Sequence, residues 1–394
     1  MKKVLMVASV ASMIGQFNMN NLSILQELGY EVHVACNFMD RTIWTNERIK
    51  CFVDELRVKG ISYHQIEFPR EPIDIKRISM AYRELKKLVC TNKFDFIHCH
   101  APVAGVISRI VAHQSHTNIV YTSHGFHFFN GASKKNWILF YPIEKFLSKW
   151  TDILITINME DYNRAKDKFR AKRIVYIPGV GVDTYKFYPK ECNEENELEY
   201  IEKFQKIRSE FNIPLDAKVL VSVGELNENK NHESVIRALA DISDLHSKDV
   251  FYLIAGQGKL KEKLQRVIDE LGLTRRVILM GFRNDVTDIY ISANAYILPS
   301  HREGLNVSLM EAMASGLPCL CGNIRGNVDL IDTNGGFLFN SSSVSDIREK
   351  ISMFLKLNDS QMTIMRSHNL KKVKSFDKNI VSNSMKMIYE MFLE

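Results

Sequence analysis

The sequence predicts an α/β protein built from two doubly wound parallel sheets. Short apolar runs rich in Val, Ile and Phe alternate with amphipathic stretches along almost all of the 394 residues. Continuous apolar strands that alternate with helices are typical of parallel sheets covered on both faces. The alternation breaks once, around 189–217, and then restarts. At roughly 150 residues per domain, this length also favours two domains.

The first half contains seven expected strands. The first, at 3–8, also resembles the start of a signal peptide, because Lys2 and Lys3 precede an apolar run. We prefer the strand, since a helical stretch and a second strand at 31–36 complete a βαβ unit. The remaining strands are expected at 61–68, 94–99, 118–123, 152–157 and 173–177. A helix is expected over 73–90, where apolar residues recur at spacings of three and four.

The second half repeats this organisation after a connection at 189–217. Strands are expected at 218–223, 250–255, 276–280, 295–298, 317–321 and 336–339, and helices at 343–356, 359–373 and 376–393. We therefore expect one domain over 1–190, a second over 191–375, and a terminal helix, 376–394, that packs back on the first domain. In such folds ligands bind at the carboxyl ends of the strands, facing the cleft between the domains.

The charge is uneven along the chain. Residues 1–190 hold 27 Lys and Arg against 17 Asp and Glu. A basic half fits phosphates, nucleic acid or an anionic membrane surface, and unevenly distributed surface lysines explain it equally well. Seven cysteines without a CxxC pair favour a reducing, cytoplasmic compartment and argue against a zinc site. No apolar run reaches the roughly 18 residues of a membrane span.

The most informative segment follows the expected strand at 295–298. A loop containing Gly304 leads into a helix that begins near Asn306 or Val307, and its free amides and dipole form an anion site. Glu303 and Glu311 can reach one pocket from either side of a bound anion, and a carboxylate can accept from two vicinal hydroxyls of a sugar. Taken alone, two acids near a helix N-terminus are also what the dipole favours in any protein.

The context of these acids is more specific. Glu303, seven residues, and then Glu311 followed by Ala-Met-Ala-Ser-Gly-Leu-Pro resemble the retaining glycosyltransferases of family 4, which have the GT-B fold. The resemblance implies that Glu311 holds the ribose of a nucleotide and that Glu303 lies near the donor sugar, as a catalytic residue. It also implies that the loop amides meet the diphosphate. These are the amides of Gly304, Leu305, Asn306 and Val307.

A strand–Gly–loop–Lys element resembles the same family. The resemblance places Gly224 at the donor and Lys230 on the diphosphate, where its charge would stabilise the leaving group. The family's usual Arg after this glycine is replaced by Glu225. Either Lys230 and the helix amides suffice, or another arginine substitutes. The candidates are Arg283, Arg302 and Arg325.

The segment 281–286 resembles the family's base-binding loop. Phe282 or Arg283 would contact the base by backbone hydrogen bonds or stacking. A strand-to-helix turn with Asp285 near the helix cap is an equally good interpretation of these side chains.

The first half carries the expected catalytic histidine. His124 ends the strand at 118–123, where the resemblance implies a histidine near the donor sugar, and His127 is the second choice and an acceptor-side candidate. His98 and His100 are better explained as core residues or as supports for the site. The segment 9–16 replaces a Gly-Gly loop of the family, and Gly15 and Gln16 remain as candidates to face the acceptor.

The stretch 128–150 interleaves aromatic residues with lysines and resembles members that build bacterial capsules and exopolysaccharides. The resemblance implies transfer from a UDP-sugar, with retention, to a lipid-linked saccharide at the cytoplasmic face of the membrane. The stretch itself suits either an interfacial membrane contact or a core helix with solvated lysines. No metal is expected, because Lys230 and a helix N-terminus meet the phosphate charge and no Asp-x-Asp pair ends a suitable strand. No cofactor and no nucleic-acid partner is expected either.

Other functions explain only some of these sequence features. A GT-B epimerase or phosphorylase, or a non-catalytic nucleotide-sugar-binding subunit, would share the phosphate site, and Glu225 is the only hint of lost turnover. A nicotinamide oxidoreductase lacks its GxGxxG fingerprint. A nucleic-acid binder fits the basic half but has no recognisable module.

Overall fold

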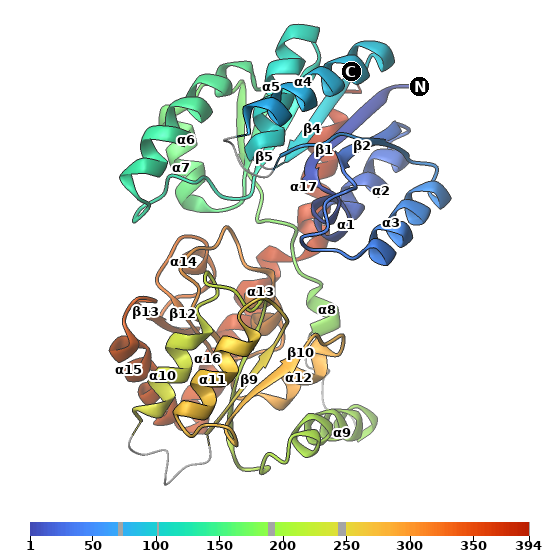
Figure 1. Ribbon diagram of the computed structural model, residues 1–394. Coiled ribbons are helices and arrows are strands. Elements are labelled where there is room, and N and C mark those ends of the chain that lie inside the picture. Colours follow the sequence, from blue (N-terminus) through green and yellow to red (C-terminus); the bar gives the residue numbers. More distant parts are fainter. Residues whose placement is uncertain (70–73, 101, 188–193, 243–249, 394) are drawn as a thin grey trace. The chain divides into compact units, whose positions relative to one another are not determined.

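The computed structural model describes residues 1–69, 74–100, 102–187, 194–242 and 250–393. The chain forms two compact units, 1–180 with 379–394, and 181–378 (Figure 1). Each unit contains one parallel sheet with helices on both faces, so the predicted α/β class is confirmed. The boundary expected at 190/191 and the helix start expected at 73 lie outside the described residues.

The first unit contains a sheet in the order β3-β2-β1-β4-β5-β6-β7, and its described pairings are parallel. The strands are β1 (Lys3–Val10), β2 (Glu31–Asn37), β3 (Ser62–Gln65), β4 (Phe96–His100), β5 (Asn118–Ser123), β6 (Ile153–Thr156) and β7 (Arg173–Tyr176). The run expected as a strand at 3–8 is thus the central strand. The strand order reverses between β1 and β4, which places their carboxyl ends where ligands bind in open α/β sheets.

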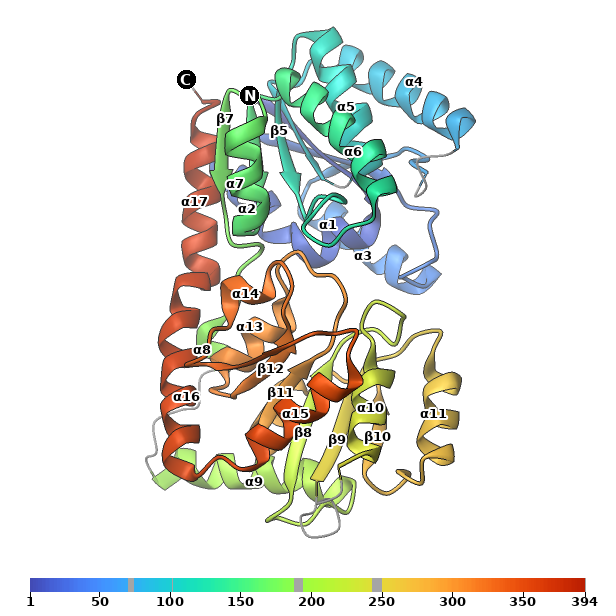
Figure 2. The ribbon, with the colours of Figure 1, turned by 90° about the vertical axis from the view of Figure 1, so that its left-hand side faces the viewer.

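Helices cover both faces of this sheet (Figure 1). They are α1 (Ala11–Phe17), α2 (Met19–Glu27), α3 (Asn46–Val58), α4 (Ile75–Asn92), α5 (Pro102–Ser115), α6 (Lys134–Leu147), α7 (Met159–Lys168) and α17 (Lys378–Glu390). The last of these buries Val381, Met385, Ile388 and Tyr389 in the core that α1, α2 and α3 share. Figure 2 shows α17 beside β7, where Arg173 donates to Met391 Sδ at 3.0 Å.

The structure corrects the expectation of a loop over 9–16. β1 continues to Val10 and α1 begins at Ala11, so Gly15 lies within a helix. A Cβ atom at Gly15 would overlap Cη2 of Trp44 and lie 3.1 Å from the Phe52 ring. Glycine is needed here because two aromatic rings pack directly against the helix backbone.

The second unit contains a sheet in the order β10-β9-β8-β11-β12-β13, with parallel pairings. Its strands are β8 (Lys218–Val223), β9 (Val250–Ala255), β10 (Val277–Gly281), β11 (Ala295–Leu298), β12 (Cys319–Gly322) and β13 (Gly336–Phe339). Its helices are α8 (Thr184–Phe187), α9 (Glu194–Glu210), α10 (His232–Ala240), α11 (Lys261–Glu270), α12 (Val286–Ser292), α13 (Val307–Ala314), α14 (Asn327–Leu330), α15 (Val344–Leu355) and α16 (Asp359–Val373).

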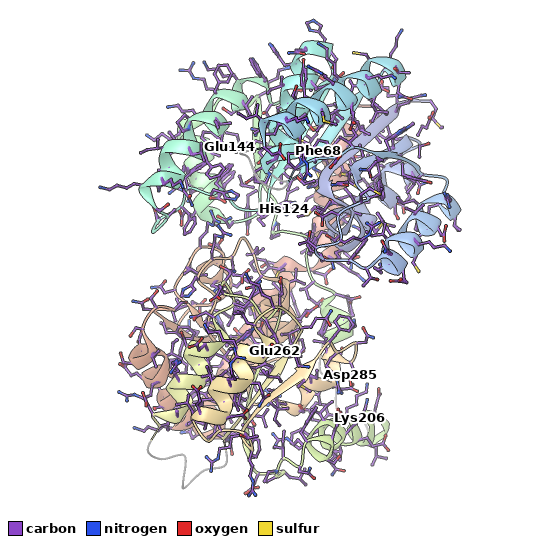
Figure 3. All side chains as sticks on the ribbon, in the orientation of Figure 1. Phe68, His124, Glu144, Lys206, Glu262 and Asp285 are labelled. Carbon is purple, nitrogen blue, oxygen red and sulfur yellow. The ribbon has the colours of Figure 1, made fainter. Side chains whose placement is uncertain are left out.

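The charged helix that we assigned to the connection at 189–217 is α9, and it packs on α12 in the second unit. Lys206 of α9 lies 2.9 Å from Asp288 and 3.8 Å from Asp285. Figure 3 labels Lys206 and Asp285. The buried Arg208 donates to the carbonyl oxygens of the turn that follows, at Pro214, Leu215 and Ala217. These bonds fold the chain from α9 back into β8.

None of the described helices is long and apolar enough to cross a membrane.

Candidate active site

The predicted donor residues lie at the carboxyl edge of the second sheet: Phe282 and Arg283 follow β10, and the others follow β8 and β11. The helix α13 begins at Val307, as predicted, and the Asn306 side chain caps it by accepting from the Leu309 amide at 2.9 Å. Ser308 Oγ donates to the carbonyl of Val223 at 2.9 Å, so the first turn of α13 is tied to the end of β8. The cap satisfies the Leu309 amide, and the Met310 amide bonds the Asn306 carbonyl. The amides of Val307 and Ser308 come before the first i,i−4 bond of the helix, where the anion site is predicted.

Lys230 and Glu303, two predicted catalytic residues, form an ion pair. Lys230 Nζ lies 2.7 Å from Glu303 Oε1, and only 16% and 12% of the two side chains are exposed. Gly224 leaves room for the Lys230 side chain, because a Cβ atom there would lie only 3.3 Å from Cε of Lys230. The loop after β8 therefore carries a cation to the start of α13.

Glu311 lies in α13, about one turn from its start. Its Oε2 is 3.1 Å from the hydroxyl of Tyr290, which is also 3.1 Å from the carbonyl oxygen of Ser308. Burial raises the pKa of the Glu311 carboxyl above its ordinary value, and the hydrogen bond from Tyr290 and, less strongly, the charge of Lys186 oppose this shift. The carboxylate is thus held in one orientation by a buried tyrosine that the sequence did not single out.

The structure distinguishes the three arginines proposed to replace the missing phosphate cation. Arg283 is paired with Asp285 and Glu210, and these bonds raise its pKa. Arg302 is exposed. Arg325 is buried, and its Nε donates to the backbone carbonyl of Glu303 at 3.3 Å. Arg325 is therefore the one of the three that packs against the Glu303 loop.

The loop after β12 also holds the Gly304 backbone in place. A Cβ atom at Gly326 would overlap the carbonyl oxygen of Gly304, and the φ of Gly326 is +80°. Both its backbone conformation and the close approach require glycine at this position.

The predicted base-binding loop follows β10. Gly281 has a φ of +72° and turns the chain, and the Phe282 ring is 66% exposed. Because the Arg283 side chain is already paired, contact with a base is left to its backbone or to Phe282.

In the first unit, His124 follows β5 by one residue (Figure 3). Its Nε2 lies 3.0 Å from Nδ1 of His100, and burial lowers the pKa of His124 to about 4. The His127 ring packs on Phe140, with centroids 4.6 Å apart. Gln16 is exposed on α1. Their predicted roles at the donor sugar and the acceptor remain predictions.

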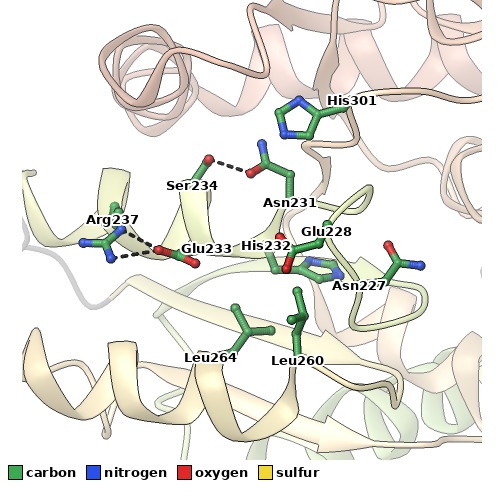
Figure 4. A pocket seen from close by; sticks show the side chains of 10 residues that line it. All are labelled: Asn227, Glu228, Asn231, His232, Glu233, Ser234, Arg237, Leu260, Leu264 and His301. Carbon is green, nitrogen blue, oxygen red and sulfur yellow. Dashed lines mark hydrogen bonds and ion pairs between the residues drawn. The ribbon is translucent and has the colours of Figure 1, made fainter. Parts of the chain in front are cut away.

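A separate pocket of about 220 Å³ lies where α10 and α11 begin (Figure 4). Its lining includes Asn227, Glu228 and His301, and Arg237 pairs with Glu233 beside them. None of the predicted donor residues lines this pocket. The candidate site is instead the open cluster of loops around Lys230 and Glu303.

Two family models together match most of the chain. The one described as Glycosyl transferases group 1 matches residues 203–371, and the one described as Glycosyltransferase Family 4 matches residues 20–185. EpsD of Bacillus subtilis (strain 168), which is assigned as a glycosyltransferase, is 35% identical over 342 residues, 86% of this chain and 83% of EpsD. This chain belongs to glycosyltransferase family 4.

A further relative of this family 4 glycosyltransferase has a defined reaction in its name. The UDP-Gal:alpha-D-GlcNAc-diphosphoundecaprenol alpha-1,3-galactosyltransferase of Escherichia coli is 29% identical over 302 residues, 75% of this chain and 73% of the relative. Among solved structures, Anabaena Alr3699/HepE in complex with UDP and glucose has a TM-score of 0.75 at 16% identity, covering 99% of this chain and 100% of that one. The GT-B fold is thereby established.

Sequence reasoning missed several supporting residues. Tyr290 and Ser308 orient Glu311 and α13, but a buried tyrosine and a helix-start serine carry no functional pattern of their own. Arg325 was one of three equal candidates in the sequence, and its contact with the Glu303 carbonyl is visible only in the structure.

Proposed function

We propose that this family 4 glycosyltransferase moves a sugar from a UDP-sugar to a lipid-linked saccharide during assembly of a bacterial surface polysaccharide, with retention at the anomeric carbon. The observation that carries the proposal is the cluster of Lys230, Glu303 and the start of α13, which combines a cation, a carboxylate and the N-terminus of a helix. The cation and the helix amides suit the binding of a diphosphate, and the carboxylate can accept a hydrogen bond from a sugar hydroxyl.

The relatives support the choice of substrates. The Escherichia coli relative uses UDP-Gal and an acceptor linked to diphosphoundecaprenol, and HepE binds UDP and glucose. A relative from Staphylococcus aureus, 24% identical, is the capsular polysaccharide biosynthesis glycosyltransferase CapM. We extend these substrate classes to this chain as part of the proposal.

In the proposed reaction the bond between the anomeric carbon and the diphosphate oxygen breaks, and a bond to the acceptor oxygen forms on the same face. Lys230 and the α13 amides stabilise the charge that grows on the diphosphate. The departing phosphate oxygen takes the proton of the acceptor hydroxyl. Glu311 holds the ribose, Glu303 and His124 contact the donor sugar, and no metal takes part.

In this proposal Arg325 supplies the positive charge that an arginine after the glycine usually supplies in this family. Its guanidinium is buried beside Glu303, while Glu225, which occupies the usual arginine position, is exposed and negatively charged. Arg325 contacts the loop that carries Glu303, whereas Arg283 lies on the loop after β10, so we place the additional cation at Arg325.

We also propose that α6 contacts the membrane that carries the acceptor. The aromatic residues of 128–150 mostly pack inward: Phe128 is fully buried, and Trp137, Phe140 and Tyr141 pack on the core. The exposed face is instead aliphatic, with Phe146 at its end. Its apolar residues are Ile138, Leu139, Ile143 and Phe146. Exposed lysines border them, at 134, 135, 145 and 149. Apolar side chains bordered by lysines suit the surface of an anionic bilayer.

The test is a panel of UDP-, GDP-, dTDP- and ADP-sugars with the wild type, Glu311→Ala and Glu262→Ala. Glu262 is exposed on α11, outside the cluster, and serves as the control. We expect a UDP-sugar to stabilise the wild type and the control against heat, and UDP release on addition of a lipid-linked acceptor, with or without EDTA. Loss of hydrogen bonds to a carboxylate, at about 1.5–3 kcal/mol, predicts a roughly 10- to 100-fold weaker affinity in Glu311→Ala.

Binding without release, in folded protein supplied with acceptor, would favour the non-catalytic subunit. Equal binding by Glu311→Ala and the wild type would contradict the ribose assignment.

A further inference from the structure

Three histidines lie together at the carboxyl ends of β4 and β5. His98 and His100 share one face of β4, with ring centroids 4.2 Å apart, and His124 follows β5. His98 is held separately, by the hydroxyl of Tyr389 at 2.9 Å and that of Thr122 at 2.8 Å. His100 is the ring that contacts His124, with 3.0 Å between Nδ1 and Nε2.

A hydrogen bond between two neutral imidazoles needs one N–H and one lone pair, so each ring determines the tautomer of the other. Burial lowers the pKa of His100 well below its ordinary value and that of His124 to about 4. Both rings are therefore neutral at pH 7, and each carries a single proton. Which nitrogen carries it depends on a third group.

Met6 of β1 is that group. Its Sδ lies 3.1 Å from Nε2 of His100, and Met6 is fully buried. A thioether sulfur accepts hydrogen bonds and cannot donate them, so this contact requires the proton on Nε2 of His100. Nδ1 of His100 then has a lone pair and accepts from Nε2–H of His124. Nδ1 of His124 is left with a lone pair, and no group among the described residues bonds to it.

We propose that Met6 and His100 are positioning residues that hold His124 in its Nε2–H tautomer, so that Nδ1 of His124 accepts a hydrogen bond from a hydroxyl of the bound sugar. The identity of that ligand rests on the proposed function, whereas the tautomer does not. His124 in this state accepts a proton or a hydrogen bond and does not donate one through Nδ1.

The tautomer is measured by NMR of protein labelled with 15N at histidine, at pH 7.5. Protonated and unprotonated imidazole nitrogens differ widely in shift, and the His124→Gln and His100→Asn variants assign the signals. We expect Nε2 protonated and Nδ1 unprotonated in both His100 and His124. A protonated Nδ1 in His124 would overturn the proposal, whether or not the protein transfers sugar.

The Met6→Leu variant tests whether the Met6 sulfur sets these tautomers, since it removes the sulfur and nearly conserves the volume of the side chain. We expect His124 to populate both tautomers, and kcat for transfer to fall about threefold to tenfold, the equivalent of one neutral hydrogen bond, with KM for the donor unchanged. Met385→Leu is the matched control, because Met385 lies buried in the same core. We expect it to leave the histidine signals and kcat as in the wild type.

Unchanged tautomers in Met6→Leu would overturn the role of Met6. The expected tautomers together with normal transfer by His124→Ala would instead contradict the proposed function of His124 at the sugar. The two failures are therefore distinguishable.

Discussion

At the residue scale, Lys230 and Glu303 neutralise each other in a poorly solvated position. They are 73 residues apart in the chain, and the pair is mostly shielded from water. Under the proposed function a diphosphate competes with Glu303 for Lys230. Binding of the donor would then free the Glu303 carboxylate to accept from a sugar hydroxyl. Donor binding alone would thus bring Lys230 to the diphosphate and Glu303 to the sugar.

The coupling between these two charges can be measured by a double-mutant cycle with Lys230→Met, Glu303→Gln and the double variant. Each single variant leaves a partly buried charge unpaired, so we expect it to lower the free energy of unfolding, and the double variant to lower it by less than the sum. Urea unfolding should give a coupling of about 0.5–3 kcal/mol.

The control for this cycle is Lys203 with Glu199, an i,i+4 pair on α9 whose side chains are 34% and 41% exposed. There we expect a coupling of only about 0.2–0.5 kcal/mol. Strictly additive effects at Lys230 and Glu303 would show that their contact contributes nothing to stability.

At the scale of elements, α1 shows how packing replaces an expected loop. Helix propensity alone predicts that Gly15→Ala stabilises α1 by about 1 kcal/mol. The new methyl group would overlap Trp44, however, and overpacking costs about 1–3 kcal/mol. We expect net destabilisation in urea unfolding, and a smaller loss in a Trp44→Phe background, which removes the far end of the indole. A more stable Gly15→Ala protein would contradict the packing of Trp44 on α1.

The proposed contact of α6 with a membrane predicts that the protein binds anionic vesicles. We expect the protein to cosediment with vesicles of phosphatidylglycerol and phosphatidylcholine, and not with phosphatidylcholine alone, because each lysine near an anionic surface contributes about 1 kcal/mol. Ile138→Glu with Phe146→Glu should abolish binding, and added salt should weaken it in the wild type.

Ile364→Glu is the control for this experiment, since Ile364 is 63% exposed on α16, a helix of the second unit. Equal loss of vesicle binding in this control, or binding that survives both substitutions in α6, would rule out α6 as the contact.

At the scale of the whole molecule, the chain consists of two units with separate cores. The predicted nucleotide residues all lie in the second unit. We expect UDP to slow hydrogen exchange at 224–230 and 303–308 and to leave β1 unchanged. At a concentration 100 times Kd it should stabilise the second unit by about 2.7 kcal/mol. Protection of 124–127 without protection of 303–308 would place nucleotide binding in the first unit.

Much of the fold was predictable, because strands and helices follow local patterns. The strands at 118–123, 218–223, 250–255, 295–298 and 336–339 lie where the apolar runs predict them. The start of α13 at Val307, with Asn306 as its cap, was predictable because capping depends on residues that are neighbours in the sequence. The loop expected at 9–16 was wrong, since its helix depends on Trp44 and Phe52, which are distant in the chain.

The sequence by itself determined the α/β class, the two parallel sheets and the family, because periodicity and motif spacing are properties of neighbouring residues. Only the tertiary structure decided which groups meet. It pairs Lys230 with Glu303, holds Arg283 on Glu210, places Arg325 against the Glu303 loop and links Met6 through His100 to His124. Such contacts depend on strand order and on the packing of side chains from distant segments, which no local pattern specifies.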